Sequence, residues 1–452
     1  MRTLLKIAGL AVVASGSMAA LAADNLDGRW DAQLVRGENV IPFRLDISGQ
    51  GPSLKGTLYD GFRPNENTTS ATYKDGQLTL NIEHYLTTIS AKLEGEKLVG
   101  TVVAQNRENR ADYQFIATRH VDAPAAVSAG APSIAGSWEI PLEAPSSKGE
   151  KAFRLIVDQK GAEVAASILR VDGDTGAYSG TFKDGKWVLA HFDGSRPGVI
   201  VVTPGQDGTL EIQQRQDRVR PATEATTDKP YGESAPDGRY SAKLVAYRTE
   251  VARAKGLPEP ANYLTHTSAR DPNEKFTFNF KDVHGKPVSS DDPQFKGKVI
   301  VAIVTGTWCP NCHDEAQYLV QLDKKYRDKG LAIVALDFEE AEQQDSLTRV
   351  NAFVKQYGVK YPYLIAGAPA EMWEKVPQLV NLNTWPATVF VGRDGTVRAV
   401  HAGFASPAAG EFHAQLKKEF TARIETLIAE KAPAQLTSAD EANTSTRVAD
   451  AR

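Results

Sequence analysis

The amino-acid sequence predicts a multidomain protein in which two repeated all-β units precede a C-terminal α/β domain. Short motifs in the region 25–222 recur at a nearly constant offset, and apolar residues there alternate with polar ones. After about residue 275, runs of β-branched residues alternate with helical patterns. The chain has 452 residues, which is enough for about three domains of ~150 residues each.

The first 22 residues predict a signal peptide. Arg2 and Lys6 supply positive charge, the stretch 7–18 is apolar, and small residues end at Ala22. This order is typical of an export signal that is cleaved after the small residues. We therefore expect an exported protein, most simply a periplasmic one, cleaved near Ala22.

The composition fits soluble globular domains, with 41% hydrophobic and 24% charged residues. A formal net charge of −4 argues against a nucleic-acid partner, which would require a basic surface. Beyond the N-terminus no stretch is apolar for the roughly 18 residues that a membrane span needs. We expect neither nucleic-acid binding nor a membrane span in the mature chain, and the oligomeric state stays open.

Three pairs of motifs define an internal repeat. They recur in the same order at offsets of 108, 110 and 109 residues: Gly28-Arg29-Trp30 with Gly136-Ser137-Trp138, Phe43-Arg44-Leu45 with Phe153-Arg154-Leu155, and Tyr73-Lys74-Asp75-Gly76 with Phe182-Lys183-Asp184-Gly185. A shared offset of this kind indicates that each copy is one structural unit. The predicted units are 24–121 and 134–222.

Each unit has the pattern of short antiparallel strands. Phe43, Leu45 and Ile47 alternate with polar residues, which is the period-two pattern of a half-buried strand. Asp75-Gly76 tolerates the positive φ that a tight hairpin turn requires. About seven or eight strands fit each copy, so we expect a small barrel or sandwich. The alternative is one larger barrel to which each copy contributes half.

Three segments are predicted to connect or follow these domains. The Ala/Pro-rich stretch 121–133 is typical of a linker, and so is the polar stretch 222–237. Residues 433–452 lack apolar periodicity and predict a disordered tail.

The order of elements in 237–432 predicts a thioredoxin-like fold. The expected elements are a buried strand at 298–304, a helix that follows and ends at Gly330, a strand at 331–336, a helix at 346–357, a hairpin of 387–391 with 397–401, and a last helix at 411–430. Strand, helix, strand, helix, hairpin and final helix form the thioredoxin arrangement.

Cys309 and Cys312 are the only two cysteines of the chain, and they form one C-x-x-C motif. A disulfide-stapled exported scaffold would have several pairs spread along the chain. Here Cys309 comes directly after a buried strand and opens a helix, where unpaired N–H groups favour a thiolate. In C-x-x-C proteins such surroundings lower the cysteine pKa from ~8.5 toward ~7. We expect Cys309 to be the nucleophile and Cys312, one turn later, the resolving thiol.

The segment from Thr307 to Glu315 resembles the active site of the TlpA-like family of periplasmic thioredoxins, and 297–301, 384–390 and 392–395 resemble its central strand, proline strand and hairpin. The resemblance covers about 275–430. It implies a redox-active disulfide and no other cofactor, supported by Trp308, Pro310, Asn311 and Glu315. It also implies that Pro386 is cis beside Cys309 and that Trp385 offers its backbone to a substrate strand. The implied activity is reduction of protein disulfides, with electrons from a membrane or thioredoxin-type donor.

Two residues depart from the thioredoxin pattern. Ile303 stands where thioredoxin has a buried acid, so proton transfer would require water, Glu315 or Glu339. Gln317 replaces a proline that is common in relatives, which argues against a helix kink.

Other interpretations remain open. The same site would serve a thiol oxidase or isomerase, and the β units could be the working part of a binding protein with an accessory redox domain. A zinc site lacks a second cysteine pair, although His284 and His401 are conceivable ligands. We expect Trp30 and Trp138 in the cores of the units, His313 on the helix surface, and the acidic run 339–342 in a solvated loop.

Overall fold

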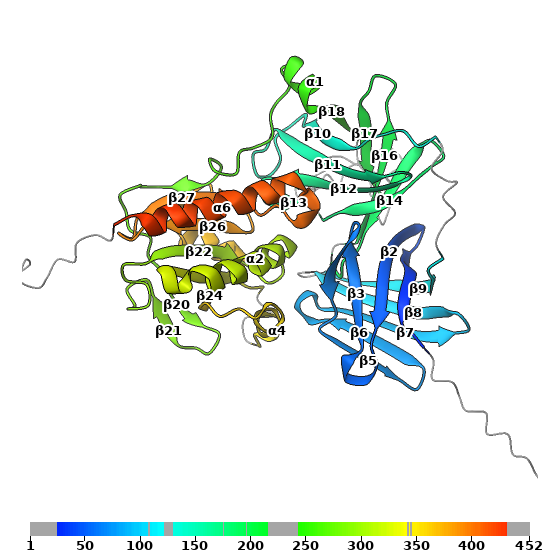
Figure 1. The fold of residues 1–452 in the computed structure, drawn as a ribbon, viewed down its shortest axis with the longest axis horizontal. Coiled ribbons are helices and arrows are strands. Elements are labelled where there is room, and N and C mark those ends of the chain that lie inside the picture. Colours follow the sequence, from blue (N-terminus) through cyan, green and yellow to red (C-terminus); the bar gives the residue numbers. More distant parts are fainter. Residues whose placement is uncertain are drawn as a thin grey trace, which may run out of the picture.

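The computed structural model describes residues 25–106, 109–121, 130–174, 176–195, 197–215, 243–340, 343 and 346–431. The predicted signal peptide, the polar linker at 222–237 and the predicted tail lie outside these residues. Figure 1 shows two β domains on one side of a mixed α/β domain. No helix of the described residues is both long and apolar enough to cross a membrane.

The first β unit is a nine-stranded antiparallel sheet with the order β4-β3-β2-β1-β9-β8-β7-β6-β5. Its strands are β1 (Gly28–Arg36), β2 (Asn39–Ser48), β3 (Lys55–Asp60), β4 (Arg63–Asn67), β5 (Ser70–Lys74), β6 (Gln77–Ile82), β7 (Thr87–Glu94), β8 (Lys97–Asn106) and β9 (Asn109–Arg119). Along β2 the buried Leu45 and Ile47 alternate with more exposed neighbours, as predicted. Asp75 and Gly76 have φ of 53° and 74° and form the hairpin turn between β5 and β6, also as predicted.

The second β unit has its own nine-stranded sheet, with the order β11-β10-β18-β17-β16-β15-β14-β12-β13. Its strands are β10 (Gly136–Pro141), β11 (Ala152–Lys160), β12 (Glu163–Arg170), β13 (Gly173–Asp174), β14 (Tyr178–Lys183), β15 (Lys186–His191), β16 (Gly198–Pro204), β17 (Leu210–Gln214) and β18 (Leu244–Arg248). β11 also pairs with β12, so the sheet closes into a barrel. The alternative of one barrel shared by both copies is therefore wrong.

Strand β18 corrects the expected boundary of the second unit. It lies beyond 222–237, yet it pairs with β10 and β17 of the second barrel. The second unit thus extends to Arg248, and the α/β domain begins after it rather than at 237. The five residues of β18 are too short a segment to show a clear strand pattern in the sequence. Only their pairing with β10 and β17 identifies them as a strand.

Corresponding residues of the two units make the same contacts. The Trp30 and Trp138 side chains are buried, and each indole Nε1 donates to the carbonyl four residues earlier, at 3.0 and 2.9 Å. The guanidinium carbon of Arg119 lies 4.0 Å from the Trp30 ring, and that of Arg248 lies 3.8 Å from the Trp138 ring. Such cation–π contacts add to the packing at each barrel end. This correspondence supports the predicted repeat.

The α/β domain has a seven-stranded sheet with the order β21-β20-β24-β23-β22-β26-β27. Its elements are β19 (Ser268–Ala269), β20 (Asn279–Asp282), β21 (Pro287–Ser289), β22 (Val299–Thr305), α2 (Pro310–Tyr326), β23 (Leu331–Phe338), α4 (Thr348–Tyr357), β24 (Tyr363–Gly367), α5 (Met372–Lys375), β25 (Leu379–Val380), β26 (Ala387–Val391), β27 (Val397–Ala402) and α6 (Glu411–Ala429). The short helix α1 (Thr249–Ala254) comes before them and packs against β10 and β18 of the second unit. β22, β23 and β24 are parallel, and β26 and β27 form the antiparallel hairpin. This is the predicted thioredoxin-like fold.

Both faces of this sheet are covered. Alternate residues of β22 contribute to two hydrophobic clusters, one shared with α2, α4 and α6 and the other with α5 and the segment 276–295. Complete burial on both faces explains why β22 is a continuous β-branched run. The strands β20, β21 and β24 were not predicted, because they are short or only partly apolar.

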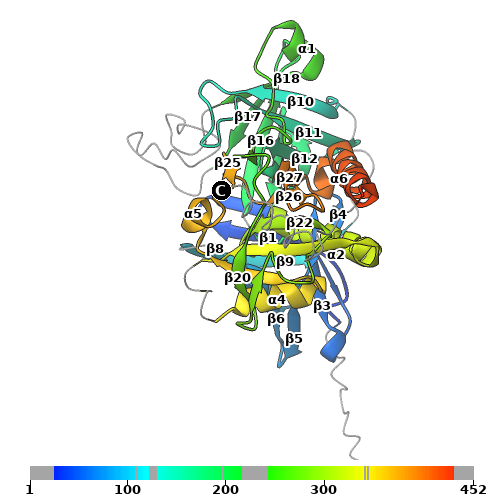
Figure 2. The ribbon, with the colours of Figure 1, turned by 90° about the vertical axis from the view of Figure 1, so that its left-hand side faces the viewer.

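The two β units lie on the same side of the α/β domain (Figure 1), which covers much of them in the view of Figure 2. Leu169 of β12 belongs to the hydrophobic cluster of α2 and α6. A 3-10 turn of the first unit, η2 (Glu83–Tyr85), packs against α4. The units also contact each other, because Thr87 Oγ1 donates to the Gly194 carbonyl at 2.8 Å and the Phe43 and Phe192 rings lie 4.8 Å apart.

Candidate active site

Cys309 is the N-cap residue of α2, directly after the turn that follows β22. Its N–H donates to the Gly306 carbonyl at 3.0 Å, and its carbonyl accepts from the Cys312 N–H at 3.0 Å. Pro310 occupies the first helical position, where a missing N–H costs nothing. Both cysteines are free thiols and both are buried, with 5% and 1% exposure. The structure thus brings the two cysteines of the predicted active site together at the start of α2.

The two thiols have unequal surroundings. Burial raises the pKa of Cys312 well above its usual value, and the hydrogen bond and charge of Cys309 raise it further. Cys309 Sγ instead lies 3.5 Å from the Trp385 carbonyl, beside the proline strand. At neutral pH Cys312 is therefore a protonated thiol that needs a base before it can react.

The Trp385–Pro386 peptide bond is cis, as expected, and it immediately precedes β26. The Trp308 and Trp385 rings are 5.1 Å apart in an edge-on arrangement. Trp308 Nε1 donates to the Phe338 carbonyl at 2.9 Å, which fixes its indole over the end of β23. Trp308 is the packed neighbour of the site that we expected.

Glu315 is a buried residue of α2, with 1% exposure, and it is close enough to Cys309 to interact with it electrostatically. One carboxyl oxygen accepts a short hydrogen bond from Thr388 Oγ1. Burial raises the pKa of Glu315 to about 8, the Thr388 bond lowers it, and the charge of Cys309 raises it. Thr388 pairs with Ile303 in the sheet, and Ile303 stands where thioredoxin has a buried acid. Through its bond to Thr388, Glu315 of α2 brings a carboxyl group to this part of the sheet.

Glu339 and Glu340, the described residues of the acidic run after β23, are buried rather than solvated, contrary to our expectation. Arg349 of α4 is buried and donates at 2.8 Å to both Glu339 and Glu340. Glu339 also accepts from Thr307 N and Oγ1 at 2.8 and 2.6 Å. The ion pairs offset the desolvation of these carboxylates and attach the Thr307 turn to α4. Both Glu339 oxygens are thus engaged with Thr307 and Arg349.

His313 lies in a domain interface, and its expected surface position was wrong. Its side chain is buried, with Nε2 2.7 Å from the Thr307 carbonyl and Nδ1 2.8 Å from the Tyr357 hydroxyl. A carbonyl only accepts, so Nε2 carries a proton and donates to it. His84 and Tyr85 of the first β unit stack against this ring at 4.7 and 4.5 Å. Nothing local in the sequence marks this burial, because the covering residues are far away in the chain.

Asn311 connects the motif to the second β unit. Its Nδ2 donates to the Asp172 carbonyl at 2.7 Å. The family resemblance implied a supporting role for Asn311, but its partner lies 139 residues away in the chain and has no local signal in the sequence.

In the described part of the chain, no group of three or more His, Cys, Asp or Glu residues is arranged to hold a metal ion. His401, which we considered as a ligand, is buried, and its Nδ1 lies 3.0 Å from the Gly403 carbonyl. Burial lowers the pKa of His401 to about 4, so it is neutral at physiological pH.

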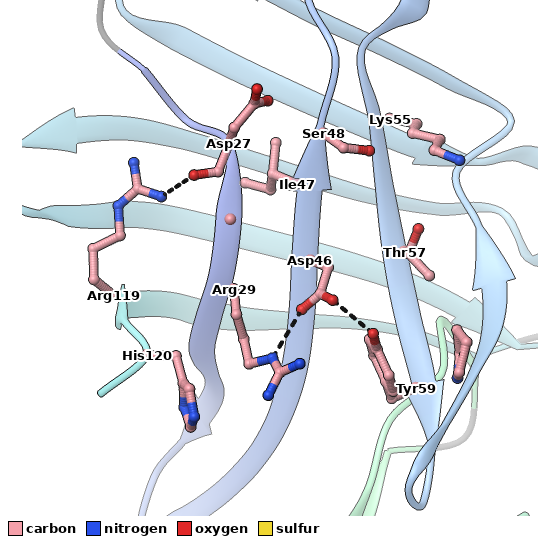
Figure 3. Close-up of a pocket in the computed structure, with 12 residues that line it drawn as sticks. Asp27, Arg29, Asp46, Ile47, Ser48, Lys55, Thr57, Tyr59, Arg119 and His120 are labelled. Atoms are coloured by element: carbon pink, nitrogen blue, oxygen red, sulfur yellow. Dashed lines mark hydrogen bonds and ion pairs between the residues drawn. The ribbon is translucent and has the colours of Figure 1, made fainter. Parts of the chain in front are cut away.

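An open pocket lies on the surface of the first β unit, lined by residues of that unit (Figure 3). Three of its charged residues, Arg29, Asp46 and Arg119, already have partners within the first unit. Asp46 pairs with Arg29 at 3.4 Å and accepts from the Tyr59 hydroxyl at 2.6 Å, and Arg119 donates to the Asp27 carbonyl at 2.6 Å. None of the cysteine motif contributes to it.

A family model described as Redoxin matches residues 268–416. Thiol-disulfide oxidoreductase ResA of Bacillus thuringiensis (strain Al Hakam) is 32% identical over 120 residues, which are 26% of this chain and 62% of that protein. Thioredoxin-like protein YneN of Bacillus subtilis (strain 168) is 31% identical over 128 residues, 28% of this chain and 68% of that protein. The match to ResA thus spans less than two thirds of its length.

Among solved structures, a thiol:disulfide interchange protein of the thioredoxin family from Chlorobium tepidum TLS is 23% identical. The superposition covers 36% of this chain and 100% of the Chlorobium chain, with a TM-score of 0.28. The sheet order, the dithiol at a helix start and the cis-proline beside it define a thioredoxin-fold domain. Through this domain the chain belongs to the TlpA-like family of thioredoxin-fold proteins.

The Arg349 network yields a stability prediction. Replacing Arg349 with Met leaves Glu339 and Glu340 buried without a counter-charge, so we expect the free energy of unfolding to fall by about 3–5 kcal/mol. Arg398→Met is the matched control, because Arg398 is 32% exposed and its pair with Asp394 lies at the surface. That variant should lose no more than about 1 kcal/mol. Urea denaturation compares the two, and equal losses would contradict this view of the network.

Proposed function

We propose that the protein is an exported thiol–disulfide oxidoreductase that reduces disulfides of protein substrates, with Cys309 as nucleophile and Cys312 as resolving thiol. The asymmetry of the two thiols carries this proposal. Cys309 lies at the helix start beside the proline strand, whereas Cys312 is a buried, protonated thiol. Export follows from the predicted signal peptide.

The reaction has two exchange steps. The Cys309 thiolate attacks one sulfur of the substrate disulfide, a Cys309–substrate disulfide forms, and the other substrate sulfur leaves as a thiolate and takes up a proton. Glu315 then accepts the Cys312 proton, and the Cys312 thiolate attacks Cys309. The second substrate sulfur leaves and is protonated. Two electrons and two protons pass to the substrate, and the Cys309–Cys312 disulfide remains.

A dithiol donor, either membrane-bound or thioredoxin-like, would return the electrons by the same exchange in reverse. The direction follows from thiolate stability. A C-x-x-C pair becomes oxidising when its reduced form is stabilised as a thiolate. Here burial holds Cys312 as a thiol, so the thiolate stability that matters is that of Cys309. The resemblance to the TlpA-like family favours reduction of substrates over the oxidase or isomerase alternative.

Trapping tests the assignment of the two thiols. A Cys312→Ser variant forms the Cys309–substrate disulfide but cannot resolve it, so reductant-sensitive adducts should accumulate in the exported compartment. Non-reducing electrophoresis and mass spectrometry identify the adducts and their cysteine. The Cys309→Ser variant is the control and should give none. Equal yields of adducts from the two variants would refute the assignment.

The role of Glu315 predicts a pH dependence of the second step. With a pKa of about 8, Glu315 is neutral below that pH and becomes a carboxylate that can accept a proton above it. The rate at which Cys312 displaces a group from Cys309 should therefore rise with pH and level off above about 8. An aromatic disulfide reagent measures this rate directly, because its second thiol is released in this unimolecular step.

Glu315→Gln removes the acceptor. The plateau rate of the second release should fall by about 10² or more, and its rise near pH 8 should disappear. The first release, which reports the attack by Cys309, should change much less. Glu374→Gln, an exposed carboxyl in α5, is the control. A Glu315→Gln variant that keeps the rise near pH 8 would rule out Glu315 as the acceptor.

A further inference from the structure

The second β unit places one turn, residues 171–174, directly beside the cysteine motif. Asn311, two residues after Cys309, donates to the Asp172 carbonyl at 2.7 Å. Gly173 forms a parallel β-bridge with Phe404, which follows β27. Asp174 accepts from Ser406 N and Oγ at 2.6 and 3.0 Å. The turn therefore contacts both the start of α2 and the segment after β27.

These contacts reach the proline strand. Gly403 N–H donates to the Pro386 carbonyl at 2.8 Å, so the segment 403–406 borders the proline that faces Cys309. A Cβ on Gly403 would lie 2.3 Å from the Val171 carbonyl oxygen. A Cβ on Gly173 would lie 2.2 Å from the Phe404 carbonyl oxygen and 2.6 Å from Asn311 Nδ2. Two glycines thus allow the two backbones to approach more closely than any other residue would permit.

The turn is rigid within its own barrel. Glu150 accepts from the Val171 N–H at 2.6 Å, and the Asp172 carboxylate pairs with Lys148 at 2.7 Å. Lys148 and Arg170 keep the pKa of Asp172 far below its usual value despite its burial, so this carboxylate stays charged. The turn is held in one shape, and it leaves the motif only if the second unit shifts.

We infer that the 171–174 turn is a specificity-determining element of the dithiol site, which admits disulfides in short or extended segments and excludes those on folded protein surfaces. The inference rests on the proposed reductase function. Cys309 is only 5% exposed. The turn covers the side of the site that Asn311 and Phe404 form. A disulfide in a short peptide can approach along the remaining side, where Trp308 and Trp385 lie. A folded substrate requires the turn to be displaced first. Its reaction rate is therefore proportional to the fraction of molecules in which the turn is displaced.

Gly173→Ala tests this inference because the added Cβ cannot fit against Phe404 and Asn311. The readout is the second-order rate at which each disulfide oxidises the reduced protein, with a linear disulfide-linked peptide and with folded insulin. We expect Gly173→Ala to raise the insulin rate by about tenfold, while the peptide rate changes by less than about twofold. Gly185→Ala in the same barrel is the control, because Gly185 also has a positive φ of 78° but no neighbour within 4 Å.

Asp174→Ala is a second variant in case Gly173→Ala does not fold, since it adds no Cβ clash and deletes the bonds to Ser406 together with one bond from the Gly176 N–H. It should also raise the insulin rate selectively. If both folded variants leave the insulin rate unchanged, or if both substrates slow together, the inference is overturned. A wild-type protein that fails to reduce the peptide would refute the proposed function instead, so the two failures are distinguishable.

Discussion

The backbone of Thr307 is the point on which the geometry of the dithiol depends. Glu339 accepts from its N–H and its hydroxyl, and His313 donates to its carbonyl. This turn determines where β22 ends and α2 begins, and hence where Cys309 lies. The carboxylate is held in place by buried Arg349, and the imidazole by Tyr357 and the first β unit. The position of the sulfur atoms is therefore set by charges and rings in three separate segments.

The β units complete the site rather than accompany it. His84 and Tyr85 of the first unit pack on His313, and the 171–174 turn of the second unit binds Asn311. Glu66 of the first unit extends the contact, because the Tyr357 hydroxyl donates to it at 3.3 Å. Each unit thus contacts one residue of the first helical turns that follow Cys309. This arrangement gives a physical reason for the two added domains, which catalysis alone does not require.

Sequence patterns predicted the parts of the molecule that are determined locally. The two β units follow from period-two alternation and the Asp-Gly turns, and the thioredoxin-like sheet follows from β22 and the order of elements after it. The dithiol was visible because only two cysteines exist. The burial of His313 and Glu339 was missed because their partners, Tyr85 and Arg349, come together only in the tertiary fold. Strand β18 was missed for the same reason, since five residues gain their identity from β10 and β17.

The reduction potential of the Cys309–Cys312 pair tests the central claim most directly. Cys312 remains a buried thiol, and we propose that the Cys309 thiolate at the helix start stabilises the reduced pair too weakly to make it a strong oxidant. Equilibration of the full chain with glutathione buffers, followed by mass analysis of the alkylated cysteines, gives the value. We predict a potential near that of thioredoxin, about −270 mV. A potential near −120 mV, typical of strongly oxidising C-x-x-C proteins, would contradict the account.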